Sequence, residues 1–327
     1  MKVAVLQQIY KSARFVEKVY SAIMAQDYPD FKVYTQVSVD DGAVEKIKKF
    51  FPQVEIIDPG ENLGMCKGHN QLFNSIEADV FVLVNPDAVL EKNYISEAVK
   101  VLQADSSVGA VAGKIFKYDF GNNMKLVVFD STGIDVYKSG RVKDRGQFEQ
   151  DLGQYDKKAY ITGVSGCIPV YRKSAIMDVA HEGKEVFDEN FFAYYDDTDL
   201  SLRLLWRGWK IAFAKDAVAY HARTASGSQS GMKKPIEFIK HHRSHAYNIR
   251  SLSFKNQILT IIKNFPRFSL NLILRQIAWL GYVLIFETDT LKIIPQTIKE
   301  IPVAYKRRKE IMRGRKISVE EFEKYLL

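Results

Sequence analysis

Short apolar segments alternate with amphipathic segments along the first 116 residues, and this alternation limits the folds that the chain can adopt. We predict strands at residues 3–6, 32–39, 54–57, 80–84 and 108–116. We predict helices at residues 13–25, 43–51, 67–76 and 94–103. Strands separated by helices at this spacing favour an α/β fold with an open, mostly parallel sheet and helices on both faces.

Polar residues follow three of these predicted strands. Asp40 comes directly after the second strand, Asn62 and Gly64 come shortly after the third, and Asp87 comes shortly after the fourth. Ligands of open α/β sheets bind beyond the carboxyl ends of the strands. We therefore expect a binding site at this edge of the sheet.

Three carboxylates fall within four positions where a helical pattern begins, at Asp196, Asp197 and Asp199. Asp199 and Arg203 are spaced to form an ion pair on that helix. Asp197 is expected near the helix N-cap, where a carboxylate meets free backbone N–H groups. This position fits a reaction site, and it also fits simple helix capping.

A histidine and a strand-end carboxylate are the candidate metal ligands. The segment Asn85-Pro86-Asp87 ends a predicted strand, and Asp87 there could bridge Mg²⁺ or Mn²⁺ to a diphosphate. His221, which comes seven residues after a short apolar strand expected at residues 211–214, could ligate the same ion. Each feature has a structural alternative, because Asn-Pro-Asp is a common turn and a single histidine often only packs.

Glycine-rich segments suggest where the backbone comes close to a ligand. The stretch ENLGMCKGHN places two glycines before a predicted helix, which favours an anionic or nucleotide group there. It is neither a P-loop nor a dinucleotide-binding fingerprint, so ATPase and dehydrogenase functions lose their main support. A strand-like run is also expected at residues 160–171, where Gly163 and Gly166 would admit a ligand.

The positive charge lies in the last part of the chain. Of 327 residues, 46% are hydrophobic and 26% are charged, as in a soluble globular protein, and the two cysteines fit a reducing compartment. The net charge of +8 comes from residues 250–327. No nucleic-acid-binding motif accompanies these basic residues, so we expect no nucleic-acid partner.

We predict that this basic part is helical, with breaks at Pro266, Pro295 and Pro302. Its most apolar stretch, residues 268–286, contains Arg275 and two polar side chains, which are costly at a bilayer centre. We expect it to lie in a membrane interface or to pack on the main domain. The basic runs 306–309 and 313–316 would then face anionic lipids. The alternative is an ordinary solvated helix face.

Taken in order, the motifs make a more specific pattern. The segments VSVDD, ENLGMCKGHN, LVNPD, TGVSGCIPVYRKSA, VFDENFFAYYDDTDLSLRLLWRGWKIAFAKDAVAYH and YNIRSLSFKN lie within residues 1–255. This set resembles the family 2 glycosyltransferases of the GT-A fold, and most of all the rhamnosyltransferase-like members that build cell-surface polysaccharides. The chain departs from the family pattern at Asp196, where glutamate is usual.

The resemblance implies roles for individual residues. Asp197 or Asp196 would be the catalytic base, with Asp197 favoured, and Asp87 and His221 would bind Mg²⁺ or Mn²⁺. The nucleotide sugar would contact six further residues: Asp40, Asn62, Gly64, Asn70, Asn85 and Gly166.

The resemblance also implies a function. We expect a catalytic GT-A domain at residues 1–230 and a basic helical extension at residues 231–327, with membrane contact. The enzyme would invert the anomeric centre of a dTDP- or UDP-sugar, rhamnose or a similar hexose, on a glycan or lipid-linked acceptor. It would work in the cytoplasm, at the inner face of the plasma membrane. The alternatives are a non-catalytic sugar-binding protein and a sugar-phosphate nucleotidyltransferase, whose Gly-rich, Arg-containing N-terminal loop this chain lacks.

Overall fold

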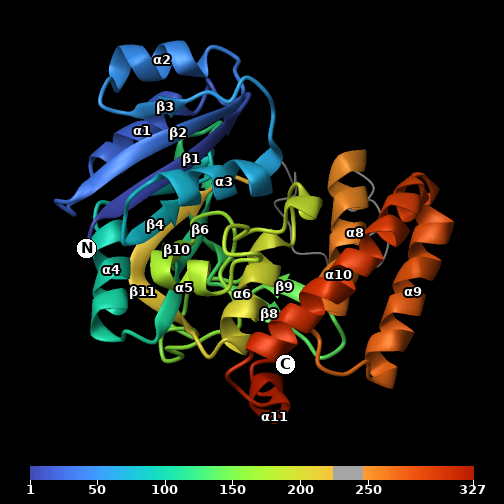
Figure 1. Cartoon of the computed structure of the whole chain (residues 1–327). Helices are drawn as coiled ribbons and strands as arrows, with labels where there is room; N and C mark the ends of the chain where they lie inside the picture. The colour runs from blue at the N-terminus through green and yellow to red at the C-terminus, as the bar shows by residue number, and fades with distance from the viewer. Residues whose placement is uncertain (224–245) are drawn as a thin grey trace.

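A nine-stranded mixed sheet runs through the molecule and carries helices on both faces (Figure 1). The computed structural model describes residues 1–223 and 246–327. The strand order is β3-β2-β1-β4-β10-β6-β11-β5, and β7 pairs with β6. The predicted α/β class with a mostly parallel sheet and a helical C-terminal part is confirmed.

The strands that were predicted from apolar runs are present, with small shifts at their ends. The sheet consists of β1 (Val3–Tyr10), β2 (Phe31–Val39), β3 (Glu55–Ile57), β4 (Val80–Leu83), β5 (Ala88–Leu90), β6 (Val108–Asp119), β7 (Met124–Ser131), β10 (Val170–Arg172) and β11 (Lys210–His221). A separate hairpin is formed by β8 (Ile134–Val136) and β9 (Val142–Asp144). The hairpins therefore fall in the Gly-rich region between residues 117 and 160.

Helices connect the strands and cover the sheet. The main part contains α1 (Val16–Met24), α2 (Ala43–Phe50), α3 (Gly64–Ser75), α4 (Tyr94–Ala104), α5 (Lys173–Asp178), the 3₁₀ turn η1 (Glu189–Phe191) and α6 (Asp196–Trp206). The C-terminal part contains α8 (Tyr247–Asn264), α9 (Leu270–Phe286), the 3₁₀ turn η2 (Thr288–Ile293), α10 (Ile294–Gly314) and α11 (Val319–Glu323).

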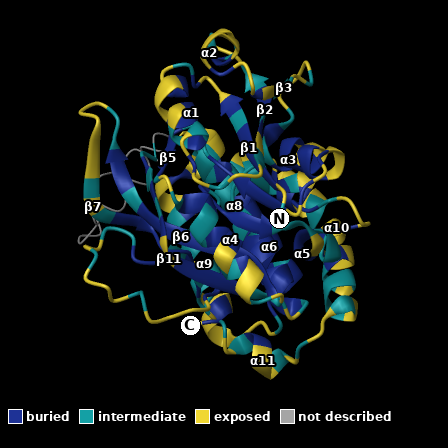
Figure 2. Ribbon diagram, turned by 90° about the vertical axis from the view of Figure 1, so that its left-hand side faces the viewer, coloured by how far each residue is buried: buried dark blue, intermediate teal, exposed yellow. Residues whose placement is uncertain are grey.

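The alternation of side chains along β1 shows how two apolar layers form. Val3 and Val5 pack with α1, α2 and α4, whereas Ala4 and Leu6 pack with α3, α5 and α6 on the other face. Successive side chains of a strand point to opposite faces, so an unbroken apolar run fills both layers. Figure 2 shows the resulting buried centre of the sheet.

Two predicted features are wrong. The segment 160–171 is not a continuous strand, because only Val170–Arg172 pairs within the sheet and the rest makes isolated bridges. The backbone there, which includes Gly163 and Gly166, instead forms loops beside α6. Pro302 also does not end a helix, since it lies inside α10, whereas Pro295 lies at the start of α10 as its fixed φ favours.

The C-terminal helices pack directly on the main domain that contains the sheet. Leu259 of α8, Ala304 of α10 and Phe322 of α11 belong to the same buried cluster as α3 and α6. The ring of Phe322 stacks on Trp206 at 3.8 Å between centroids. The predicted boundary at residues 230 and 231 lies outside the described residues.

None of the described helices is, on its own, both long enough and apolar enough to cross a membrane. Leu270–Phe286 and Thr288–Gly314 meet the length and composition criteria only as a pair, and this pair is bent by 115°.

Candidate active site

The sheet topology brings His221 next to Asp87. His221 is the last residue of β11, and β5, which begins directly after Asp87, runs antiparallel to it with Ala88 opposite His221. His221 Nε2 lies 3.1 Å from Asp87 Oδ1 and 3.4 Å from Asn85 Nδ2. Two candidate metal ligands 134 residues apart in the chain therefore meet at one edge of the sheet.

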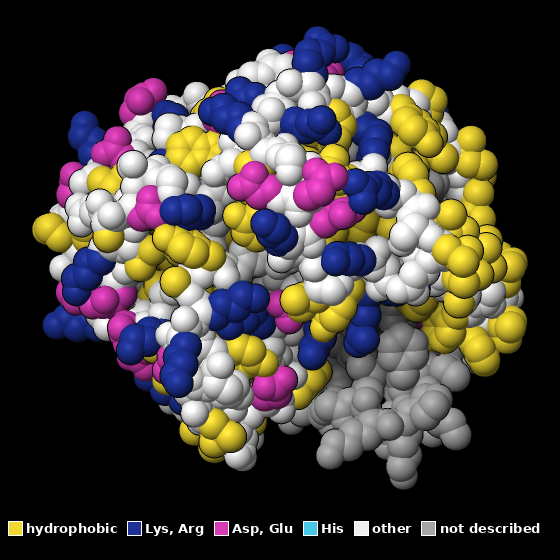
Figure 3. Space-filling model, turned by 90° about the horizontal axis from the view of Figure 1, so that it is seen from below, with side chains coloured by type: hydrophobic (Ala, Val, Ile, Leu, Met, Phe, Trp, Pro, Cys, Tyr) yellow, Lys and Arg dark blue, Asp and Glu magenta, His cyan; other side chains and the backbone are white. Residues whose placement is uncertain are grey.

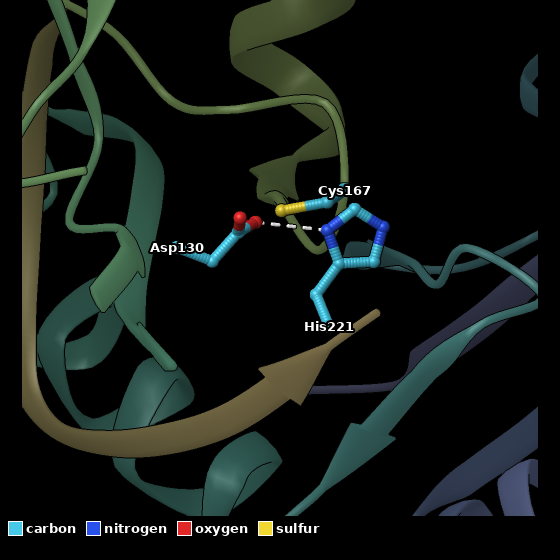
Figure 4. Close-up of side chains that lie close together, drawn as sticks. All are labelled: Asp130, Cys167 and His221. Carbon is cyan, nitrogen blue, oxygen red and sulfur yellow. Dashed lines mark hydrogen bonds and ion pairs between the residues drawn. The ribbon is translucent and has the colours of Figure 1, made fainter. Parts of the chain in front are cut away.

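A second carboxylate holds the other side of the imidazole. His221 Nδ1 donates to Asp130 Oδ2 at 2.9 Å, and Asp130, at the end of β7, is fully buried (Figure 4). Arg223 Nε donates to the other oxygen of Asp130 at 2.6 Å and its guanidinium also pairs with Asp144. We call Asp87, Asp130, His221 and Arg223 the His221 cluster.

Charges are balanced within the His221 cluster. Burial lowers the pKa of His221, but the carboxylates of Asp87 and Asp130 outweigh this effect and raise it to about 9. Burial likewise favours a neutral Asp130, yet Arg223 and His221 hold the pKa of this carboxyl below its usual value. Each negative charge in the cluster thus has a cationic neighbour.

The donor atoms of this cluster suit a small divalent cation. Asp87, a carboxylate, and His221, an imidazole, are ligands that Mn²⁺ accepts, and Mg²⁺ favours the carboxylate. Ligands at right angles around such an ion, with bonds of about 2.0–2.1 Å, lie roughly 3 Å apart. The separation of Asp87 Oδ1 and His221 Nε2 matches this value. A bound ion would take the place of the Nε2 proton.

Cys167 lies beside these groups and forms a compact set with Asp130 and His221, whose ligand atoms are all within 4.8 Å of one another (Figure 4). Burial raises the pKa of the Cys167 thiol, which therefore stays protonated. A protonated thiol is a poor metal ligand, so the Asp87 side of His221 is the better position for an ion.

The second group of carboxylates is at the start of α6. Asp196 and Asp197 are the first two residues of this helix, so Asp197 follows the N-cap, Tyr195, by two positions. Asp197 Oδ2 accepts the backbone N–H of Gly166 at 2.7 Å, and its Oδ1 accepts the N–H of Thr198 at 2.6 Å. We call Asp196 and Asp197 the acid pair.

No cation neutralises the acid pair among the described residues, and its pKa values rise. Burial, followed by the charge of Asp197, raises the pKa of Asp196 to about 8. Burial also raises the pKa of Asp197, to about 6, although the hydrogen bond from Gly166 opposes it. Asp196 Oδ2 is buried and has no hydrogen-bond partner among residues 1–223 and 246–327. At neutral pH the pair therefore shares roughly one proton, mostly on Asp196.

Asp199, two residues further on, has the opposite environment. Its carboxylate pairs with Arg203 Nε at 2.9 Å and Lys263 Nζ at 2.9 Å, and all three side chains are buried. The predicted pair of Asp199 and Arg203 is confirmed. Burial works against ionisation of Asp199, but Lys263 and Arg203 keep its pKa low.

One loop segment connects the two groups. The backbone N–H of Gly166 holds Asp197, and the next residue, Cys167, accepts the backbone N–H of Asn85 at 3.0 Å. A side chain at Gly166 would place its Cβ 3.2 Å from Asp197 Oδ2. Gly166, which was predicted to contact the sugar, thus also fixes the spacing between the acid pair and the His221 cluster.

The predicted nucleotide-binding residues occupy the same edge of the sheet. Asp40 is exposed at the end of β2, and its carboxylate accepts the N–H groups of Gly42 and Val44. Asn62 is exposed before α3 and accepts the N–H of Gly64 at 3.0 Å. Gly64 has a φ of +71°, a conformation that favours glycine.

Asn70, also predicted to contact the nucleotide sugar, is held by the protein itself. Its side chain is buried and both ends of the amide bond the backbone of Phe187, at 2.8 Å each. The residue therefore supports the segment before the acid pair, and its predicted contact with the nucleotide sugar stays a prediction. The sequence pattern could not distinguish these roles, since both require a polar side chain on α3.

Asp130 and Arg223 were not predicted from the sequence. Asp130 ends a strand whose alternation is weak, and Arg223 follows His221 directly, with no spacing that marks it as functional. Both become recognisable only when β7 and β11 have been placed on either side of β6.

The comparisons with known proteins agree with this fold. Residues 3–234 match the family model "Glycosyltransferase like family 2". The fold and the sheet-edge site define a glycosyltransferase of the GT-A type, and the match covers more than half of the chain. The chain belongs to glycosyltransferase family 2. No curated protein matches the sequence.

Solved structures share the fold at low sequence identity. The mannosyltransferase PcManGT from Pyrobaculum calidifontis, in complex with GDP-Man and Mn²⁺, is 16% identical, with a TM-score of 0.53, over 96% of this chain and 85% of that one. GalNAc-T7, with UDP, GalNAc and Mn²⁺, is 10% identical, with a TM-score of 0.65, over 99% of this chain and 56% of that one.

Proposed function

We propose that the protein is an inverting, metal-dependent hexosyltransferase that uses a nucleotide-diphosphate sugar. The observation that carries the proposal is the pairing, across Gly166 and Cys167, of an unneutralised acid pair with a carboxylate–histidine cluster. Such a site offers a proton acceptor on one side and a place for a diphosphate-bound cation on the other.

Asp197 acts as the base in this proposal. With a pKa of about 6 it is ionised at neutral pH, whereas Asp196, with a pKa of about 8, retains a proton. Asp197 takes the proton of an acceptor hydroxyl, and the oxygen of that hydroxyl forms a bond to the anomeric carbon. The bond from that carbon to the diphosphate breaks on the opposite face, so the configuration inverts and the nucleoside diphosphate leaves.

Asp87 and His221 would hold Mg²⁺ or Mn²⁺, which when bound neutralises charge on the departing diphosphate. Asp130 keeps the imidazole of His221 oriented through Nδ1. The Mn²⁺ named with PcManGT and GalNAc-T7 supports a metal here, and it leaves the choice between the two ions to experiment.

A dTDP- or UDP-sugar is our proposed donor, with rhamnose or a similar hexose, and a glycan or lipid-linked acceptor of cell-surface polysaccharide synthesis. Asp40, Asn62 and Gly64 would contact the nucleotide, because they lie beyond the carboxyl ends of β2 and β3. The resemblance noted in the motifs supports rhamnose, and the GDP-Man and UDP of the two structural neighbours keep other donors under test.

Calorimetry tests the proposal with dTDP-rhamnose and a panel of UDP- and GDP-sugars, each with and without Mn²⁺. We expect one donor to bind in a metal-dependent manner and to be turned over with an acceptor. Metal-dependent binding without turnover of any donor, by folded protein and over a range of glycan acceptors, would favour the alternative of a non-catalytic sugar-binding protein. No binding at all would refute the site assignment.

We also propose that α9 rests on the anionic inner face of the plasma membrane. Ten large hydrophobic side chains are exposed along and beside it: Phe268, Leu270, Ile273, Leu274, Ile277, Leu280, Leu284, Ile285, Phe286 and Ile298. Figure 3 shows hydrophobic side chains gathered on this flank of the molecule, at the right of the view. Monomeric proteins seldom expose apolar patches of this kind without a partner.

Charge favours a lipid surface as that partner. Helix α9 has no acidic residue, and its only charged side chain is Arg275. The exposed Lys138 and Arg141 flank Gly140, which approaches Gln276 of α9. Anionic headgroups attract such basic residues beside an apolar helix face. The prediction for the basic run 306–309 is wrong in part, because Arg307 pairs with Glu185 and Asp188, and Arg308 donates to backbone carbonyls.

Sedimentation with vesicles of phosphatidylglycerol and phosphatidylcholine tests this contact. We expect Ile277→Glu with Leu284→Glu to lower the bound fraction about tenfold or more. Val127→Glu is the matched control, since Val127 is an exposed apolar residue on β7 and should leave binding unchanged. Wild-type protein that ignores the vesicles and forms a dimer in solution would show that a second copy covers α9.

A further inference from the structure

The loop of residues 188–195 joins the nucleotide side of the site to the acid pair. The ring of Phe192 lies over Gly64, where an added Cβ would come within 2.5 Å of it, and Phe192 accepts the backbone N–H of Cys66. The loop then leads directly into Asp196 and Asp197. Its conformation therefore sets where the acid pair stands relative to the start of α3.

The backbone of this loop is held in an unfavourable conformation. Phe192, Tyr194 and Tyr195 have φ angles of +62°, +69° and +65°, in the left-handed region that residues other than glycine seldom adopt. Such conformations persist only where the surroundings over-determine them, and they cluster at functional sites.

The side chain of Asn256, on α8, reaches three carbonyls of this loop. Asn256 is completely buried, and its Nδ2 lies 3.0 Å from the carbonyl oxygen of Phe191, 2.8 Å from that of Ala193 and 2.9 Å from that of Tyr194. The carbonyl of Phe191 also accepts the backbone N–H of Ala193, and the amide adds a donor to this carbonyl and to those of Ala193 and Tyr194. Three acceptors around one nitrogen also fix which end of the amide faces the loop.

Neighbouring residues of α8 support the same segment. Lys255 donates to the carbonyl of Asn190, and Lys263 pairs with Asp188 Oδ2 at 2.7 Å. Asn264 Nδ2 donates to Asp199 Oδ1 at 2.7 Å, inside the first turn of α6. One polar face of α8 thus spans from the loop to the helix that carries the acid pair.

We propose that Asn256 is a positioning residue, which fixes the acid pair for reaction by holding the loop of residues 188–195 in its left-handed conformation. The proposal rests on the proposed transferase function for its kinetic consequence. It makes the C-terminal helices part of the active site, in addition to any surface that they offer to lipid.

Asn256→Leu tests the proposal, because leucine has the same branching and the same number of side-chain heavy atoms and removes the donors. We expect kcat to fall at least about tenfold while the Kd of the donor changes by less than about threefold, since misplacing a reacting group by 1 Å is costly. The acidic limb of the pH profile of kcat should also move, because the surroundings of Asp197 change.

Gln257→Leu is the matched control. Gln257 is the next residue on α8, is equally buried, and donates from Nε2 to a single backbone carbonyl, that of Gly140, at 3.1 Å. It should lose comparable thermal stability and keep kcat within about twofold. An unchanged kcat in Asn256→Leu, or an equal loss of kcat in Gln257→Leu, would overturn the proposal.

Two further measurements apply if Asn256→Leu does not fold or if the wild-type chain is inactive. If Asn256→Leu does not fold, Asn256→Ser keeps one donor and should lose kcat about three- to tenfold. If the wild-type chain turns over no donor, the proposed function fails, and hydrogen exchange still decides the role of Asn256. Amides of residues 192–197 should then exchange faster in Asn256→Leu than in Gln257→Leu, and equal rates would refute it.

Discussion

The His221 cluster and the acid pair contain similar carboxylates in opposite electrostatic states. In the first, Asp130 lies between His221 and Arg223, and burial is offset by these cations. In the second, Asp196 is buried, Asp197 is half-buried, and both have raised pKa values; among the described residues Asp197 receives only backbone and hydroxyl hydrogen bonds. Burial alone therefore does not set the charge of these groups, and the presence of a cationic neighbour does.

The His221 cluster and the acid pair therefore suit two different chemical tasks within one site. A carboxylate that stays ionised beside a histidine can bind a metal without changing its protonation at neutral pH. A carboxylate with a pKa near the working pH can take up and release a proton. The variants and conditions that follow each change either the His221 cluster or the acid pair.

Asp197→Asn should have the largest effect, because it removes the proposed base and keeps the shape of the side chain. We expect kcat to fall about 10²- to 10⁴-fold, with the donor Kd changed by less than about threefold. Single-turnover kinetics and calorimetry with the donor measure the two quantities. Transfer at a near wild-type rate would show that Asp197 is not the base.

The same group predicts a pH dependence of the wild-type enzyme. Because the pKa of Asp197 is raised to about 6, the base is protonated below this pH and kcat should fall roughly tenfold for each pH unit further down. Initial rates at saturating donor between pH 5 and pH 8 measure it. A rate independent of pH in this range would contradict the assignment.

Asp130→Asn should have the next largest effect among the variants, through the orientation of His221. We expect the affinity for Mn²⁺ to fall about 10- to 100-fold, the usual result of losing the hydrogen-bond partner of a ligating histidine. Titration of Mn²⁺ followed by electron paramagnetic resonance measures it without turnover. Asp151→Asn is the control, as this carboxylate pairs with Lys114 outside the His221 cluster and should not change metal binding.

Asp196→Asn should have the smallest effect. Unlike the other variants, it should give a gain, which is in the free energy of unfolding. The folded-state pKa of Asp196 is raised to about 8, so its folded form prefers the proton. The stability it contributes is complete below pH 4 and is lost as the pH rises towards 8. Asparagine carries no charge, so the variant should gain stability over wild type as the pH rises from 4 to 8, and nothing at pH 4.

Urea unfolding at the two pH values measures this change. A stability difference between the variant and wild type that is the same at pH 4 and pH 8 would show that the carboxyl of Asp196 is not held in its neutral form.

Several parts of the site followed from local patterns. Asp87 was expected at the ligand-binding edge because it follows a predicted strand, and His221 was expected as a possible imidazole ligand of the same ion. The pair of Asp199 and Arg203 followed from helical spacing alone. Each of these predictions rests on a short local pattern around the residue concerned, so the sequence alone contains the information needed to make it.

Other parts depended on contacts between distant segments. Asn70 bonds the backbone of Phe187, 117 residues later, and Arg307 pairs with Asp188 across the interface of α10. Residues such as these look like binding or surface residues in the sequence. Their burial became visible only with the packing of the helices.

The sequence by itself determined the α/β sheet, the family and the identity of the carboxylates, because periodicity and short motifs are local properties of the chain. Only the tertiary structure decided which carboxylates are neutralised, which loop holds the acid pair, and which helix of the C-terminal part supports that loop. The physical reason is that charge state and strain depend on the groups that folding brings within hydrogen-bond distance, here Arg223 beside Asp130 and Asn256 beneath the loop of residues 188–195.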